Sequence, residues 1–217
     1  ERIHFTAPHP IHMTSETIDA LALPKHVNYI HLPVQSGSNA VLRRMNRRYT
    51  REFYLELIGK IRARNPAIAL GTDIIVGFCG ESEADFEQTV DLYKQADFDI
   101  SYTAMYSPRT GTAAYKAFPD DVPREEKKRR WELLQKLQEE TVLRKNQAYV
   151  GREVSVLVDE FLPVPLADGS APGWCMGNSR EMKRVRFPGT KESVGKIVPV
   201  QIDRAQEWIL WGQSNGR

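Results

Sequence analysis

The stretch Ile68–Gly80 reads IALGTDIIVGFCG, a run rich in β-branched residues that closes on glycine. The run extends from Ile68 to Val76, is interrupted at Gly71 and is followed directly by Gly77. A short apolar run bounded by turn residues is typical of a strand that is buried on both faces, as in a parallel sheet. We therefore expect a buried parallel strand here, with a tight turn at its carboxyl end.

Strand-like and helix-like segments alternate on both sides of this run. Further strands are expected at 2–6, 27–32 and 98–105, and helices beginning at Thr14, Ser38, Thr50 and Ser82, each a residue that can cap a helix. This order predicts an α/β fold with parallel strands joined by helical crossovers. Four strands cannot close a barrel of eight, so one sheet face should stay open unless upstream chain or another subunit covers it. We favour upstream chain.

The pattern changes near residue 150. A helix is expected from Pro123 to about Tyr149, and Gly151 ends it. Residues 153–161 then alternate between apolar and polar, and short strands are expected at 174–179, 182–187, 196–202 and 207–211. Such a series predicts a small antiparallel β-barrel. We place the domains at 1–150 and 151–217.

Composition indicates a globular protein and excludes several classes. The chain has 217 residues, of which 41% are hydrophobic and 27% charged, and no apolar run is long enough for a membrane span. It begins with Glu1 inside a strand-like run, which suggests a piece of a longer protein. Its two cysteines, Cys79 and Cys175, stand in no metal-binding motif, so we assign no metal ligand and no catalytic residue. Few cysteines and no signal peptide favour the cytoplasm.

The net charge is only +2, but the charges are segregated along the chain. Residues 43–51 contain five arginines and no acid, and residues 174–196 contain six basic side chains against two acids. Segregated positive charge favours a polyanionic partner, although an arginine-rich helix face can also be simply solvated.

Polar or glycine-rich sequence follows three of the expected strands. The segments are His31–Ser38 (HLPVQSGS), Thr72–Glu81 (TDIIVGFCGE) and Tyr106–Thr112 (YSPRTGT). In a β/α barrel, the carboxyl ends of the strands and the loops after them form the site. Gln35, Ser36, Asp73, Gly77 and the 106–112 loop are therefore expected to line one cleft.

Together these segments resemble the radical-SAM methylthiotransferases, in particular the MiaB-type enzymes that modify tRNA. Met45–Thr50 (MNRRYT) and the helix after Val122-Pro123 also look like this family, and the likeness extends from Arg2 to about Trp211. The resemblance implies the C-terminal part of a TIM-like radical-SAM half-barrel, followed by a TRAM domain that holds RNA.

The resemblance also implies an activity, cofactors and a partner. The family transfers a methylthio group to carbon 2 of N6-isopentenyladenosine beside the anticodon, with S-adenosylmethionine and two [4Fe–4S] clusters. One cluster cleaves the cofactor to a 5′-deoxyadenosyl radical, and the other is tied to sulfur donation. Both cysteine sets lie upstream of the region matched here, so this chain alone is expected to be inactive. The implied partners are the anticodon stem–loop of tRNA and the missing N-terminal part of the same protein.

The matching positions carry expected roles. Cofactor contacts are expected from Gln35, Ser36, Asp73, Gly77, Phe78, Tyr106 and Ser107. RNA contacts are expected from Arg47, Arg48, Arg109, Arg180, Lys183, Arg184 and Arg186, with Phe187 stacking on a base. For Asp73 and Arg109, a structural role is the alternative.

Two other functions compete with this interpretation. The first is the related enzyme that methylthiolates an aspartate of a ribosomal protein, whose barrel domain binds protein. The basic run at 180–186 and the Arg109–Thr112 loop favour tRNA instead. The second is a non-catalytic RNA-binding module, but truncation explains the missing cysteines more simply. The chain also departs from the family pattern at Cys79, at Gly177–Arg180 and in a long loop from Leu162 to Gly173.

Overall fold

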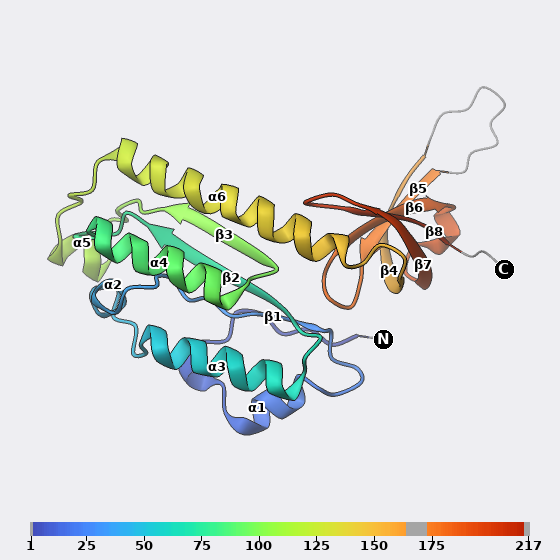
Figure 1. Cartoon of the computed structure of the whole chain (residues 1–217), viewed down its shortest axis with the longest axis horizontal. Coiled ribbons are helices and arrows are strands. Elements are labelled where there is room, and N and C mark those ends of the chain that lie inside the picture. Colours follow the sequence, from blue (N-terminus) through green and yellow to red (C-terminus); the bar gives the residue numbers. More distant parts are fainter. Residues whose placement is uncertain (1, 164–172, 215–217) are drawn as a thin grey trace. The chain divides into compact units, whose positions relative to one another are not determined.

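The computed structural model describes residues 2–163 and 173–214. The chain divides into two compact units, residues 1–139 and 140–217, and helix α6 (Arg124–Gln147) contains the division. Figure 1 shows the helices gathered around one sheet in the first unit and the strands of the second unit wrapped into a barrel. Among the described residues, no helix combines the length and apolar composition that a membrane span requires. Of the long loop expected between Leu162 and Gly173, residues 164–172 lie outside the described part.

The sheet of the first unit has the order β1-β2-β3 and all its pairings are parallel. Its strands are β1 (Tyr29–His31), β2 (Ala69–Val76) and β3 (Ile100–Met105). The prediction of a strand at 2–6 is wrong, because Ile3 forms only an isolated parallel bridge to His26. Ala7 has a φ of 52°, a left-handed conformation that ends the extended backbone. The central strand β2 is the one predicted from the β-branched run.

Helices α1 (Ser15–Ala20), α2 (Asn39–Arg44), α3 (Arg51–Arg64) and α4 (Glu83–Ala96) begin after the predicted capping residues. The side chains of Thr14, Ser38, Thr50 and Ser82 accept hydrogen bonds from the first free backbone N–H groups. At α4, Ser82 and Asp85 form the predicted capping box. Sequence reasoning missed α5 (Ala113–Ala117), a short helix capped by Thr112 within the loop after β3.

The core of the first unit lies between the sheet and its helices. Tyr54 of α3, Phe86 and Tyr93 of α4 and Phe98 are almost completely buried, together with Ile74 of β2. Along β2, successive side chains point to opposite faces, so Leu70, Thr72, Ile74 and Val76 share one face and Gly71, Asp73 and Ile75 the other. Asp73 and Ile75 are partly exposed, which identifies their face as the open one.

The second unit is a closed barrel with the strand order β4-β5-β6-β8-β7. Its strands are β4 (Glu153–Leu162), β5 (Gly173–Asn178), β6 (Arg184–Gly189), β7 (Ile197–Ala205) and β8 (Leu210–Ser214). The predicted small barrel is confirmed with one correction: β6 and β8 run parallel, while the other neighbours are antiparallel. Five strands cannot alternate in direction around a closed ring, so one pair must be parallel. Val156, Val185, Phe187, Ile202 and Leu210 fill the interior.

Candidate functional site

The carboxyl edge of the first unit's sheet brings together two of the predicted strand-end segments. Gln35 forms an isolated parallel bridge to Ile74, so the segment after β1 adds to the edge of β2. Gln35 N donates to the carbonyl of Asp73 at 2.8 Å, and Ile75 N donates to the carbonyl of Gln35 at 2.9 Å. Gln35 has a φ of 71°, which is uncommon for a residue other than glycine. The backbone of Gln35 is thus held beside that of Asp73.

Ser36 is completely buried behind this edge. Its hydroxyl lies 3.3 Å from Thr89 Oγ1 of α4 and accepts a hydrogen bond from Ser38 N at 3.2 Å. A Cβ added at Gly37 would lie 2.4 Å from the carbonyl oxygen of Gln88, so the turn needs glycine to approach α4. In this structure Ser36 therefore holds the turn before α2 against α4.

A row of polar side chains crosses the open face of the sheet. His31 Nε2 lies 3.0 Å from Asp73 Oδ1, and His31 Nδ1 lies 3.1 Å from Tyr29 Oη. The rings of His31 and Tyr102 are 5.6 Å apart between centroids, and Tyr102 is 59% exposed. A Cβ at Gly71 would lie 1.9 Å from Tyr29 Oη, so this glycine makes room for the tyrosine. Asp73 thus faces the open side with histidine as its partner.

A cavity of about 310 Å³ adjoins this face at the ends of β2 and β3. It is lined by Ile75, Ala104, Met105, Tyr106, Ser107, Arg109, Thr112 and Ala114. Tyr106, Ser107 and Arg109 were predicted to act at the site, and the structure brings these three together. Its lining combines apolar residues with polar ones, as small-molecule sites usually do.

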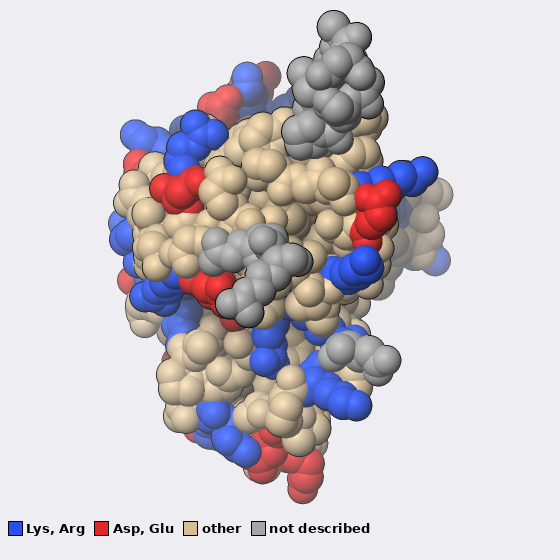
Figure 2. Space-filling model, turned by 90° about the vertical axis from the view of Figure 1, so that its right-hand side faces the viewer, with Lys and Arg blue, Asp and Glu red and all other residues tan. Residues whose placement is uncertain are grey.

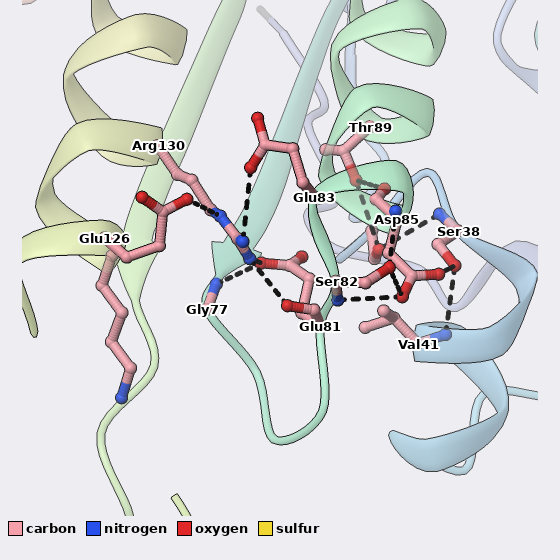
Figure 3. A network of polar contacts seen from close by, with 12 residues as sticks. Ser38, Val41, Gly77, Glu81, Ser82, Glu83, Asp85, Thr89, Glu126 and Arg130 are labelled. Carbon is pink, nitrogen blue, oxygen red and sulfur yellow. Dashed lines mark hydrogen bonds and ion pairs between the residues drawn. The ribbon is translucent and has the colours of Figure 1, made fainter. Parts of the chain in front are cut away.

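Gly77 and its loop are fixed by a buried ion pair rather than exposed in the cavity. Gly77 has a φ of 69°, and its N–H donates to Glu81 Oε2 at 2.5 Å. Glu81 Oε2 lies 2.8 Å from Arg130 Nη1, and Arg130 also contacts Glu83 and Glu126 (Figure 3). Burial raises the pKa of Glu81, although the hydrogen bonds from Gly77 and Arg130 oppose this shift. The network ties the end of β2 to the starts of α4 and α6.

Phe78, which was predicted to contact the cofactor, is buried. It packs with Val41 and Cys79, and its ring lies 4.8 Å from that of Tyr106 between centroids. Phe78 therefore supports Tyr106 from behind.

The basic residues of the first unit lie in different surroundings. Arg48 and Arg109 are exposed, whereas Arg47 is half-buried and its Nε has no hydrogen-bond partner among the described residues. Arg44 and Arg51, from the same run, are held by Asp85 and Asp91 of α4. Part of the arginine run is therefore used to connect helices.

In the second unit, some of the predicted RNA-binding residues are buried, one is ion-paired and others are partly exposed. Phe187 is 1% exposed and lies in the barrel core, so the expectation that it stacks on a base is wrong. Lys183 is also buried, with Nζ 6.0 Å from the ring centroid of Tyr149. Arg184 Nη1 contacts Asp159 at 2.6 Å, and its Nη2 contacts Glu160 at 2.8 Å. Arg186 instead lies against two tryptophan rings, and Arg180 is partly exposed.

Comparisons with known proteins agree with these two units. Residues 1–93 match the Radical SAM superfamily, and residues 147–214 match the TRAM domain. The chain is therefore similar to radical SAM proteins in its first part and to TRAM domains in its last part. The chain is also similar to coproporphyrinogen III oxidase from Escherichia coli, a radical SAM enzyme, with a TM-score of 0.53 and 20% identity over 61% of this chain and 31% of that one. That likeness concerns the fold.

The chain also has relatives in sequence. It is 44% identical over 98% of its length to a tRNA-2-methylthio-N(6)-dimethylallyladenosine synthase of Moorella thermoacetica, and it covers 47% of that protein. It is 44% identical over 99% of its length to the synthase of the same name from Bacillus velezensis, of which it covers 41%. The chain therefore spans less than half the length of these relatives. The resemblance predicted from the strand-end motifs is confirmed.

The superfamily implies S-adenosylmethionine and iron–sulfur chemistry in general. The residues of this chain do not fit a cluster, because it has two cysteines and both are buried. A [4Fe–4S] cluster normally takes at least three protein thiolates. Within the described ranges, 2–163 and 173–214, no three His, Cys, Asp or Glu side chains gather in a way that could hold a metal ion. The open polar face does fit the hydroxyl and ammonium groups of S-adenosylmethionine, because Asp73 is a half-exposed acceptor there.

The sequence analysis missed several residues on the open face of the sheet and on the barrel. His31 and Tyr102 lie on the open face with Asp73, and a signal for them existed, since alternate positions of parallel strands share a face. Trp174, Trp211 and Arg204 were missed on the TRAM barrel, because their neighbourhood depends on pairing across strands.

Proposed function

We propose that this chain is part of a tRNA methylthiotransferase that adds a methylthio group to carbon 2 of N6-isopentenyladenosine next to the anticodon. The observation that carries the proposal is the 44% identity along almost the whole chain to proteins named for that reaction. The TRAM match at residues 147–214 supports tRNA as the substrate. The rest of the protein, upstream of this chain, would hold the two [4Fe–4S] clusters.

In this proposal, residues 1–150 form the C-terminal part of the radical SAM barrel and 151–217 the RNA-binding domain. S-adenosylmethionine would lie on the open face of the sheet. Asp73, positioned by His31, would accept hydrogen bonds from the cofactor's hydroxyl or ammonium groups, because a half-exposed carboxylate retains free acceptor capacity. Tyr106 and Ser107 would meet the cofactor from the cavity rim, while Gln35 and Gly77 would shape the edge through their backbones.

The RNA would be the anticodon stem–loop of a tRNA in the cytoplasm. Arg48 and Arg109 are exposed cations of the first unit, and Arg47 lies beside Arg48. On the barrel, we keep Arg180 and Arg186 as proposed RNA contacts. Lys183 is buried and Arg184 is held by two acids, so these two are no longer proposed. Each such contact would neutralise about one phosphate and make binding salt-dependent.

The test is nucleoside analysis of tRNA from cells that lack and then regain the complete protein. Mass spectrometry should show N6-isopentenyladenosine in the first sample and its 2-methylthio derivative in the second. Unmodified tRNA in both samples, together with a methylthiolated aspartate in a ribosomal protein, would replace this proposal with the related protein-modifying activity.

A further inference from the structure

The outer face of the TRAM barrel carries a row of alternating aromatic and cationic side chains. Arg186 of β6 is paired in register with Trp211 of β8, and Trp211 is paired with Arg204 of β7. Trp174 of β5 lies next to Arg186 on the same face. The row therefore crosses four neighbouring strands, although its members are far apart in the sequence. We define these four residues as the Trp–Arg row.

Strand alternation explains why the row faces outward. Val185 and Phe187, on either side of Arg186, are buried in the core, and so is Leu210, which precedes Trp211. On β7 the register shifts between Ile202 and Arg204, which marks a β-bulge. A bulge adds one residue to its strand, so Arg204 lies opposite Trp211 and is exposed although Ile202 points inward.

The rings and guanidinium groups are stacked on one another. Arg186 Cζ lies 4.6 Å from the ring centroid of Trp174 and 5.0 Å from that of Trp211. Arg204 Cζ lies 4.6 Å from the centroid of Trp211. The two indole rings meet edge to face, with centroids 5.5 Å apart and an angle of 88° between them. Trp211 Nε1 donates to Gln206 Oε1 at 2.9 Å, which holds the ring in place.

The charge of the row is not neutralised within the described part of the barrel. Neither Arg186 nor Arg204 forms an ion pair there, whereas the neighbouring Arg184 is held by Asp159 and Glu160. Arg186 Nε is buried and donates no hydrogen bond to any described residue. Figure 2 shows basic and acidic side chains interspersed among uncharged ones on one face of the molecule. Two fixed cations without acidic partners suit an anionic ligand.

A hollow beside the row offers space for such a ligand. It has a volume of about 360 Å³ and is lined by Trp174, Asp203, Arg204, Trp211, Gly212 and Gln213. Its walls therefore combine two indole rings, the Arg204 cation, the Asp203 carboxylate and the Gln213 amide. Asp203 can accept hydrogen bonds from the edge of a base, and Gln213 can accept or donate them.

We propose that the Trp–Arg row is a stacking platform for an unpaired nucleotide of RNA. A base stacks on an indole ring whatever its identity, because every base has a π face, while arginine meets the adjoining phosphate. Such a platform binds single strands and loops rather than duplex, since bases in a duplex are already stacked. The proposal rests on tRNA as the substrate and specifies which part of it the barrel holds.

The test uses the full 217-residue chain and two fluorescein-labelled RNA probes, a stem–loop with an unpaired loop and a blunt duplex of equal length. Trp211→Ala should weaken binding of the stem–loop about 5- to 100-fold and leave duplex binding almost unchanged. Trp208→Ala is the matched control, because Trp208 is 51% exposed on the same barrel but outside the row. It should change binding less than about twofold.

Three further variants keep the test decisive if Trp211→Ala misfolds. Trp211→Phe preserves an aromatic face and should retain most of the stem–loop affinity. Arg186→Gln should lower the slope of log affinity against log salt by about one, and Arg184→Gln by less, since Arg184 is already paired. Stem–loop binding that is equal in all folded variants would overturn the platform. The row would then be interpreted as a surface that binds protein.

Failure of the platform can be distinguished from failure of the proposed function. If the complete protein methylthiolates tRNA in the nucleoside analysis but the row variants bind RNA normally, only the platform is wrong. If no tRNA is modified yet the row variants lose stem–loop binding, the platform stands as an RNA site and the proposed reaction is wrong.

Discussion

Arg130 Nη1 lies 2.8 Å from Glu81 Oε2, and the two side chains are only 5% and 0% exposed. The pair joins helix α6 to the loop that follows β2, at the edge of the sheet where the cofactor is proposed to bind (Figure 3). A buried charge that loses its partner is costly, because neither water nor another charge compensates it. The geometry of Gly77 and its loop therefore depends on a contact from a helix more than forty residues downstream.

Replacing Arg130 should destabilise the first unit strongly. Arg130→Met leaves Glu81 buried without its cation, and we expect a loss of about 3–5 kcal/mol in the free energy of unfolding. The measurement is urea unfolding followed by far-ultraviolet ellipticity, which reports the helices of that unit. Lys60→Met is the control, because the Lys60–Glu56 pair is 62% and 64% exposed and should contribute less than about 0.5 kcal/mol. The double variant Glu81→Gln/Arg130→Met should recover part of the loss, and no recovery would argue against the buried charge as its cause.

Glu126 should make the stability of the same unit sensitive to acid. Hydrogen bonds from Arg129, and further ones from Arg130, hold the pKa of Glu126 at about 2. A carboxyl whose pKa is lowered by folding stabilises the native state above its ordinary pKa and loses that contribution as pH falls toward the folded value. The difference in unfolding free energy between wild type and Glu126→Gln should be constant near neutral pH and shrink between about pH 4.5 and 2. A difference that does not vary with pH would show that the ion pairs with Arg129 and Arg130 are not its source.

Replacing Gly71 or Gly59 with alanine should change the stability of the protein in opposite directions. Gly71→Ala places a Cβ 1.9 Å from Tyr29 Oη and 2.8 Å from His31 Nδ1, so it should destabilise the protein by about 1–3 kcal/mol and disturb the open face. Gly59 lies in α3 with nothing within 4 Å of an added Cβ. Gly59→Ala should therefore stabilise the helix by about 0.5–1 kcal/mol. Thermal unfolding of both variants tests this, and equal melting temperatures would refute the crowding at Gly71.

Iron–sulfur reconstitution of this chain should yield no stoichiometric cluster. Two buried cysteines cannot supply the thiolates that a [4Fe–4S] cluster needs. Iron analysis and visible absorption after incubation with iron and sulfide are the measurements. About four irons per chain would contradict the assignment of the clusters to an upstream part of the protein.

Asp73→Asn in the complete protein should weaken binding of S-adenosylmethionine while thermal stability stays within about 1 kcal/mol. The substitution preserves shape and a hydrogen bond to His31 but removes the charge from the open face. Titration calorimetry and thermal unfolding of the same samples separate the two effects. A sharp fall in melting temperature with normal turnover by the folded remainder would make Asp73 a structural partner of His31.

Much of the fold could be predicted from local sequence. The capping residues Thr14, Ser38, Thr50 and Ser82 mark the starts of α1 to α4, because the free N–H groups of a first turn need an acceptor close in the chain. The run Ile68–Val76 predicts β2 for a similarly local reason, since β-branched residues suit a buried strand. The strand expected at 2–6 failed because pairing requires a partner, and the left-handed Ala7 ends the extended segment.

Tertiary structure alone decided which predicted residues are available at the surface. Phe187 and Arg186 are adjacent in sequence and both suited to RNA, yet strand alternation buries the first and exposes part of the second. Arg184 is two residues away and is held by acids from another strand. Trp174, Arg186, Trp211 and Arg204 meet because barrel closure sets their register, with one bulge on β7. The sequence itself gives the type of each side chain, and helix starts depend on residues close in the chain. Burial, ion pairing and strand register depend on contacts between distant segments, which only the folded chain brings together.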